Sequence, residues 1–169
     1  MPPSRWLEVL KIAAVGRNPR RTLVRAAVLG VTCYLIFSFI LLPVRVTGIS
    51  MEPTYHDHSI NFSNRLAYLF HEPRRGDVVT IRLAGIHDMF MKRIIGLPGE
   101  TVSFVHGKVY IDGSPLAEPY VINPSHWNVA PVKLDSTQYF VVGDNREMRP
   151  QDHVFGKTER FRIVGKVIL

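Results

Sequence analysis

The sequence predicts a mainly β domain, a compact antiparallel sheet, preceded by a single apolar helix that crosses a membrane. The helix is predicted by residues 26–44, which contain no charged side chain. The β domain is predicted by short β-branched and apolar runs further along the chain, separated by turns that contain Gly and Asp. A length of 169 residues allows one compact domain with a small appendage.

The apolar run has the length of a membrane span. Its 19 residues would extend about 28 Å as a helix, and the hydrocarbon core of a bilayer is roughly 30 Å thick. Thr32, Tyr34 and Ser38 are its only polar interruptions, so it lacks the polar face of a buried core helix. A cleavable signal peptide is an alternative, but the preceding 25 residues are long for the charged region of such a peptide. We therefore interpret residues 26–44 as an uncleaved transmembrane helix.

The positive charge of the chain lies mostly before this run. The net charge is +7, and residues 1–25 contribute six Lys or Arg against one Glu, a net of +5. An excess of basic residues stays on the cytoplasmic side. We expect a basic cytoplasmic segment (1–25) in a single-pass protein of the inner or plasma membrane, with residues 45–169 as an extracytoplasmic domain. The alternation of apolar and charged residues within 1–25 fits either an amphipathic helix on the inner leaflet or a frayed tail.

The composition also excludes several kinds of site. The single cysteine, Cys33, lies in the apolar run, so the outer domain has no disulfide, no cysteine-based metal site and no cysteine nucleophile. The seven histidines show no metal-binding spacing such as HExxH. The domain carries little excess basic charge, which argues against a nucleic-acid partner. We therefore expect no metal, no cofactor and no nucleic acid.

The β domain is predicted from local patterns. The expected strands are residues 78–83, 102–105, 108–111, 139–142 and 162–168. His106-Gly107 is typical of a hairpin turn. Residues 64–71 have a weak helical periodicity that Pro73 ends, and residues 115–137, rich in proline, are expected to form a long surface loop.

Two side chains of the domain have the chemistry of a nucleophile and its base. Ser50 stands on a small-residue turn six residues after the apolar run, and a serine needs a base to attack a carbonyl. A buried lysine can be that base, because burial lowers its pKa. Lys92 shares a predicted strand face with Phe90 and Ile94, while Arg93 faces the other way. Each residue also has an ordinary interpretation, as a turn serine and as an edge-strand lysine.

Four boxes in the chain resemble those of bacterial type I signal peptidases, also called leader peptidases, which are membrane-bound serine-lysine endopeptidases. The boxes are GISMEPT (48–54), RGDVV (75–79), MKRIIGLPGE (91–100) and VGDNR (142–146). The resemblance covers essentially the whole chain. It implies that Ser50 is the nucleophile and Lys92 the general base of an acyl-enzyme mechanism. It also implies a signal-peptidase-like fold, preprotein signal peptides cut after small residues, and membrane lipid as a partner, and it leaves association with the secretion machinery open.

The resemblance further implies supporting roles around Ser50 and Lys92. The N–H of Ser50 would stabilise the oxyanion, and Gly48 occupies the place where many relatives carry a second donor, a serine hydroxyl. The implied site scaffold consists of Met51, Pro53, Gly143, Asp144 and Asn145. As a hypothesis from the apolar pattern, the walls of the substrate pocket come from Ile49, Val79, Ile81 and Phe90.

The last box departs from the family pattern. Arg149 stands in the place of the serine that would orient the lysine, and Gln151 and His153 replace the acid and the arginine of the usual ion pair. Asp152 is expected to pair with His153 or with a nearby arginine. The orientation of Lys92 therefore stays open. Two alternatives follow: a non-catalytic homologue that binds leader peptides, and a processing protease dedicated to one client.

Overall fold

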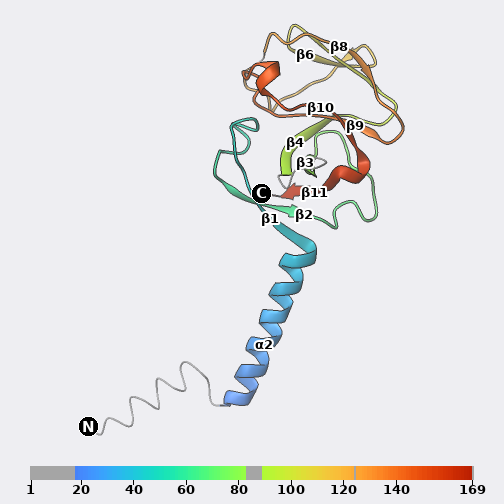
Figure 1. Ribbon diagram of the computed structural model, residues 1–169. Coiled ribbons are helices and arrows are strands. Elements are labelled where there is room, and N and C mark those ends of the chain that lie inside the picture. The colour runs from blue at the N-terminus through green and yellow to red at the C-terminus, as the bar shows by residue number, and fades with distance from the viewer. Residues whose placement is uncertain (1–17, 83–88, 124, 169) are drawn as a thin grey trace, which may run out of the picture. The chain divides into compact units, whose positions relative to one another are not determined.

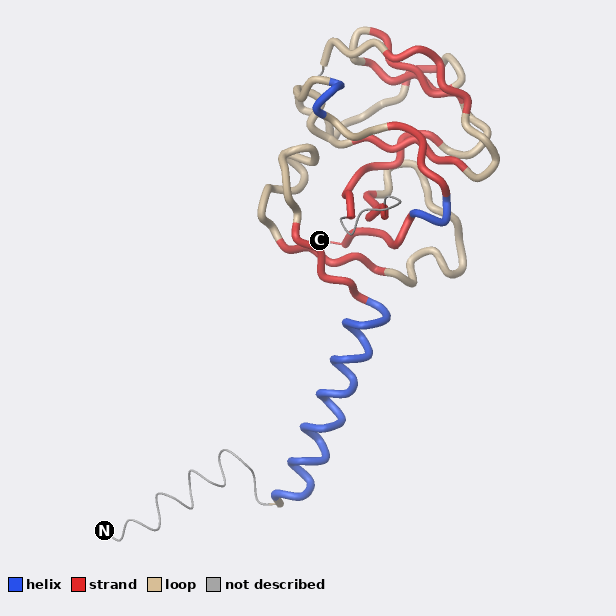
Figure 2. Tube along the Cα trace, viewed as in Figure 1, coloured by secondary structure: helices blue, strands red, loops and turns tan. Residues whose placement is uncertain are grey.

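The computed structural model describes residues 18–82, 89–123 and 125–168, shown as a ribbon in Figure 1 and by secondary structure in Figure 2. The chain divides into two compact units, a helical unit that ends at Ile40 and a β unit that begins at Leu41. The predicted amphipathic segment before Asn18 lies outside the described residues.

The helical unit is long and apolar enough to cross a membrane. Helix α2 (Pro19–Leu35) begins with a proline in its first turn, where the missing N–H costs no hydrogen bond. It continues into the π-helical turn η1 (Ile36–Ile40). Together they form 22 residues, none of them buried, and an 18-residue window within them has a mean hydropathy of 2.1. A core helix would bury one of its faces, so this exposure agrees with the interpretation of an apolar anchor.

The helix and the expected span of 26–44 have different ends. The helix begins earlier, at Pro19, because arginine is a good helix former and does not interrupt it. It also ends earlier, since Leu41–Arg45 is strand β1, which pairs antiparallel with β2 (Ile60–Asn64). A proline is tolerated in β1 because β1 is an edge strand.

The β unit consists of two antiparallel sheets in the described part of the chain, which confirms the predicted fold class. The larger sheet has the strand order β1-β2-β11-β3-β4-β9-β10, and the smaller has the order β7-β6-β5-β8 (Figure 1). The larger sheet adds to β1 and β2 the strands β3 (Val78–Arg82), β4 (Met89–Gly96), β9 (Gln138–Val142), β10 (Gly156–Glu159) and β11 (Ile163–Ile168). The smaller contains β5 (Thr101–Val105), β6 (Lys108–Ile111), β7 (Ser114–Pro115) and β8 (Val129–Lys133). Short 3-10 turns, η2 (Pro150–Asp152) and η3 (Arg160–Arg162), flank β10.

The local predictions fare unequally. The hairpin at His106-Gly107 is confirmed, since both residues have positive φ and join β5 to β6. The helix at 64–71 is wrong: the segment forms successive turns, because its backbone bonds, such as Leu69 N to Leu66 O, span three residues. The surface loop at 115–137 is also wrong in part, because it contains β8 and the buried Trp127.

Strand β4 contributes to all three apolar clusters of the β unit. Met91 packs in the cluster that also holds Met51 and Tyr55 from the turn after β1. Ile94 lies in a second cluster with residues of β3 and β9, and Ile95 lies in a third that extends into the smaller sheet. Burial of each such side chain stabilises the fold by about 1.5–3 kcal/mol. The clusters therefore hold the turn that carries Ser50 firmly against β4.

Candidate active site

The turn after β1 presents Ser50 at the surface of the β unit. Gly48 has φ +98°, a conformation that glycine adopts without steric cost, and its N–H donates to Asp57 Oδ1 over 2.8 Å. Met51 is 1% exposed and anchors the turn in the core. Ser50 itself is partly exposed. The chain therefore offers the hydroxyl to solvent from a backbone that is fixed on both sides.

The structure brings Lys92 to Ser50. Lys92 pairs with Val79 across β3 and β4, and its Nζ donates a hydrogen bond to Ser50 Oγ over 2.5 Å. The side chain is 3% exposed. Burial lowers the pKa of Lys92 to about 8, while the charge of Asp144 partly opposes this change. An appreciable fraction of the amine is therefore neutral at pH 7–8 and able to accept a proton.

The segment after β9 supports the Ser50 turn from behind. The Asn145 N–H donates to the Ser50 carbonyl over 3.1 Å, and its side chain Nδ2 donates to the Ile49 carbonyl over 3.0 Å. A Cβ on Gly143 would lie 2.1 Å from the Ser50 carbonyl oxygen, so the approach of the two backbones requires glycine at this position.

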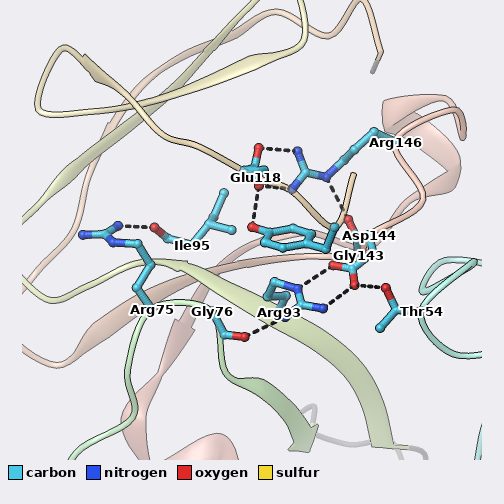
Figure 3. A network of polar contacts seen from close by, with 10 residues as sticks. Thr54, Arg75, Gly76, Arg93, Ile95, Glu118, Gly143, Asp144 and Arg146 are labelled. Carbon is cyan, nitrogen blue, oxygen red and sulfur yellow. Dashed lines mark hydrogen bonds and ion pairs between the residues drawn. The ribbon is translucent and has the colours of Figure 1, made fainter. Parts of the chain in front are cut away.

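A network of charged and polar groups joins the boxes on the other face of β4 (Figure 3). Arg93 donates Nε to Asp144 Oδ1 over 2.8 Å and Nη2 to Oδ2 over 2.6 Å, a bidentate pair. Arg93 also donates to the Gly76 carbonyl, and Thr54 Oγ1 donates to Asp144 Oδ2 over 2.6 Å. The predicted alternation of Lys92 and Arg93 on β4 is therefore confirmed, and the arginine ties the nucleophile turn to β9.

The network continues through residues that the sequence interpretation missed. Arg146 is 1% exposed and donates to Glu118 Oε1 over 2.6 Å and to the Gly143 carbonyl over 2.8 Å (Figure 3). Tyr120 donates its hydroxyl to Glu118 over 2.7 Å, and the Arg93 guanidinium lies 4.0 Å from the centre of its ring. No local pattern marks Glu118, because its partner Arg146 is 28 positions away.

Two cavities adjoin Lys92. One, of about 320 Å³, contains Ser50 and Lys92 in its wall. The other, of about 300 Å³, shares Phe90 and Lys92 with the first. The first cavity is otherwise lined by Pro43, Val44, Arg45, Val46, Thr47, Met51, Met89 and Met91.

The predicted pocket walls are right in part. Phe90 lines both cavities and Ile81 lines the second. Ile49 and Val79 are not among the residues that line either cavity. Val79 is fully buried in the core, and Ile49 is 47% exposed on the outside of the turn. The walls from Pro43 and Val44 were missed because residues 26–44 were assigned to the membrane helix, and Arg45 and Val46 were not named as pocket residues.

The residues that depart from the family pattern in the last box fall into two groups, exposed and buried. The Arg149 side chain is 71% exposed and forms an ion pair with Asp152 over 2.7 Å, which answers which partner Asp152 takes. Gln151 is exposed. His153, by contrast, is buried behind Gly143. Arg149 is therefore not the group that orients Lys92.

The structure thus places a serine hydroxyl against a buried lysine amine, which is the pair that the resemblance implied. A family model described as signal peptidase, peptidase S26, matches residues 20–169. The chain belongs to this family, which confirms the resemblance to type I signal peptidases, and it is a hydrolase of the serine endopeptidase class.

Two curated relatives agree with this assignment. The probable signal peptidase I-2 of Synechocystis sp. is 32% identical over 174 residues, covering 99% of this chain and 74% of the relative. The signal peptidase I of Bacillus licheniformis is 34% identical over 155 residues, covering 84% of this chain and 83% of the relative. A solved signal peptidase I from Enterococcus faecalis V583 is 26% identical with a TM-score of 0.49, covering 57% of this chain and 97% of that chain.

Proposed function

We propose that this chain removes signal peptides from exported preproteins, with Ser50 as nucleophile and Lys92 as general base. The observation that carries the proposal is the 2.5 Å separation of Lys92 Nζ and Ser50 Oγ, which is within the reach of proton transfer. The burial of the amine supports the role of base, because an ammonium cannot accept the serine proton.

The reaction has two halves. Neutral Lys92 accepts the proton of Ser50 Oγ as this oxygen attacks the scissile carbonyl, and the new ammonium then protonates the leaving amine of the mature protein. This leaves the signal peptide as an ester on Ser50. Lys92 next accepts a proton from a water molecule that attacks the ester, and it returns the proton to Ser50 Oγ as the signal peptide departs as a carboxylic acid, which ionises at neutral pH.

Backbone groups of the turn stabilise the developing charge. Within the described part of the chain, the Ser50 N–H makes no backbone hydrogen bond, so it is available to the oxyanion. The N–H of Gly48 is already bound by the Asp57 carboxylate and does not serve as the second donor. The chain therefore works with fewer oxyanion donors than relatives that carry a hydroxyl at position 48.

The first cavity supports the preference for small residues. It is bounded by β1 and by Met89, Met91 and Phe90 of β4 beside Ser50, and its volume of about 320 Å³ suits small side chains of an extended peptide near the cut. We place the N-terminus in the cytoplasm, the single apolar helix in the membrane lipid and the β unit outside, because Arg20, Arg21 and Arg25 stand at the start of the helix.

The test is cleavage of a preprotein with an Ala-x-Ala site by the purified full-length protein. Ser50→Ala and Lys92→Ala are each expected to lower kcat/KM by about 10³-fold or more. Ser136→Ala and Lys108→Ala are matched controls, since both residues are exposed and lie outside the boxes. Cleavage by both dyad variants at the wild-type rate would remove the dyad from the mechanism.

The same preparation separates the two alternatives. The departure of the last box favours a homologue that binds leader peptides without cutting them, and such a protein would bind the preprotein but leave it intact. Mass spectrometry of the enzyme during turnover is expected to detect the signal peptide attached to Ser50. A panel of preproteins then distinguishes a general peptidase from one with a single client, which would cut only one member.

A further inference from the structure

His153 is a buried titratable side chain that the mechanism does not use. It follows η2 and is 4% exposed. Within the described part of the chain, neither of its ring nitrogens has a partner at hydrogen-bond geometry, although the backbone groups of Ser50 and Val154 lie near enough to affect its pKa. Buried polar groups are nearly always partnered, and leaving one unpaired costs free energy. An imidazole kept in this state next to a reaction centre calls for a functional reason.

The ring lies against the backbone that carries the nucleophile. A Cβ on Gly143 would lie 2.6 Å from His153 Nε2 and 2.1 Å from the Ser50 carbonyl oxygen. The imidazole and this carbonyl therefore approach the same point, and only the missing side chain of Gly143 leaves room for both. Trp127 and Phe155 hold the ring on its other sides, with centroids 5.2 and 6.1 Å away.

The ring is neutral where Lys92 titrates. Burial lowers the pKa of His153 to about 4, and the charges of Lys92 on β4 and of Arg146 add to this effect, while the backbone of Val154 and Ser50 partly opposes it. A neutral imidazole has one N–H donor and one lone pair. It fills the space behind the Ser50 turn without placing a second cation beside Lys92.

Within the described ranges no second hydroxyl is bound to Lys92 Nζ, so the dyad depends on this support. In the described residues, the hydrogen-bond partner of Lys92 Nζ is Ser50 Oγ. The place of the usual orienting serine is taken by Arg149, which lies at the surface in its ion pair with Asp152. The position of Ser50 Oγ alone therefore decides the alignment of the two groups.

We propose that His153 is a positioning residue of the dyad, in a role that rests on the proposed function. Its ring N–H, aimed at the nucleophile turn, is available to the Ser50 carbonyl when the turn adjusts during acylation. The contact across Gly143 fixes the position of the Ser50 turn, and with it the distance between Ser50 Oγ and Lys92 Nζ. The residue touches neither substrate nor the transferred proton, so it acts only through the turn.

Two substitutions separate this role from simple packing. His153→Phe keeps an aromatic ring for Trp127 and Phe155 but has no N–H, whereas His153→Gln keeps an N–H donor and loses the ring. If the N–H positions the turn, kcat falls by about 10- to 100-fold in His153→Phe, with KM nearly unchanged. His153→Gln then retains kcat within about threefold of wild type. Arg149→Ala, a change in the same box at an exposed residue, is the control and is expected to leave kcat unchanged.

Packing alone would give the reverse order, with His153→Phe more active than His153→Gln, and that order would overturn the proposal. Equal loss in both variants with an equal fall in Tm would overturn it too. A readout independent of turnover is the NMR titration of Lys92 in protein labelled at lysine. Its pKa is expected to stay near 8 in wild type and His153→Gln, and to rise in His153→Phe because displacement of the Ser50 turn would let water reach the amine. An inactive wild type would refute the proposed function, whereas an unchanged Lys92 titration in all variants would refute only the role of His153.

Discussion

Lys92 and Arg93 are neighbours in β4 and lie on opposite faces of the strand. The surroundings lower the pKa of Lys92 and raise the pKa of Arg93. Arg93 donates hydrogen bonds to the Asp144 carboxylate and to the Gly76 carbonyl. Burial alone would lower the pKa of Arg93, but the hydrogen bonds and charge of Asp144 outweigh it and raise the pKa. Among the residues that the structure describes, Lys92 Nζ has the Ser50 hydroxyl as its hydrogen-bond partner, and burial lowers the pKa of Lys92 to about 8. Burial is thus common to both, and the placing of one carboxylate decides which cation stays charged.

The comparison also explains why the catalytic candidate is a lysine. Guanidinium stays protonated at all physiological pH values and suits a bidentate carboxylate, whereas an ammonium loses its proton readily when it is buried. Asp144 is close enough to raise the pKa of Lys92. Both of its oxygens accept hydrogen bonds from Arg93, so the guanidinium charge offsets part of the carboxylate charge felt on the other face. The ion pair therefore helps to keep the Lys92 amine neutral.

The first test replaces Lys92 by arginine, which stays charged. Of the three tests it is expected to have the largest effect on activity. In Lys92→Arg the positive charge and much of the apolar stem remain, but the group cannot accept a proton at neutral pH. We expect kcat/KM for the preprotein to fall by about 10³-fold, with binding of the preprotein largely retained. The variant is compared with Lys92→Ala, and similar losses in both would show that basicity, not charge, is what Lys92 supplies. Retention of more than about a tenth of the wild-type rate would contradict this view.

Much of the contrast was predictable from the sequence, because it depends on a local rule. Strand alternation assigned Phe90, Lys92 and Ile94 to one face and Arg93 to the other, and the period of two holds within the strand itself. The partners that act across the fold were not predictable. Nothing near Glu118 indicates its pairing with Arg146, and the burial of His153 depends on Gly143 and Trp127 together.

The end of the apolar helix shows a second limit. Residues 41–44 are as apolar as the helix before them, and a short apolar run fits a buried strand as well as a helix. Pro43 was the available signal, since proline disfavours a helical interior and its preceding residue. The error mattered for the site, because Pro43 and Val44 line the cavity at Ser50.

The second test changes Gly143. This residue contacts the Ser50 turn, and Ser50 in turn contacts Lys92. A Cβ there would lie 2.1 Å from the Ser50 carbonyl oxygen, so Gly143→Ala must displace the turn. A misplacement of about 1 Å in a catalytic group costs roughly 10²-fold in rate, and we expect kcat to fall by about that factor. The measurement is single-turnover cleavage, with Tm recorded in parallel.

Gly48→Ala is the informative counterpart of this variant. No atom lies within 4 Å of a Cβ built on Gly48, so the substitution meets only the strain of its positive φ, about 1–2 kcal/mol. A smaller loss of kcat than in Gly143→Ala is expected, together with a lower Tm. If Gly48→Ala were the more damaging of the two for kcat, the steric explanation for Gly143 would be wrong.

The third test removes the guanidinium of Arg93, on the face of β4 opposite Lys92. It is expected to give the smallest change in activity. In Arg93→Gln the charge of Asp144 is no longer neutralised, so it favours the ammonium form and the pKa of Lys92 rises above about 8. Since the neutral amine is the active form, the acid limb of the kcat/KM profile moves to higher pH, and the rate at pH 7 falls by up to about tenfold. Loss of one partner of this buried pair also destabilises the fold by about 3–5 kcal/mol, so the profile is measured at a temperature well below Tm.

Arg93→Gln combined with Asp144→Asn separates electrostatics from damage to the fold. With both charges gone, nothing on that face favours the ammonium, so the acid limb is expected to return to the wild-type position or below it even if Tm stays low. An acid limb that remains at high pH in the double variant would mean that the pKa of Lys92 follows the integrity of the turn, not the charge of Asp144. The contrast between the two faces of β4 would then rest on packing, and the comparison of Lys92 with Arg93 would have to be explained from Met51 and the Ser50 turn instead.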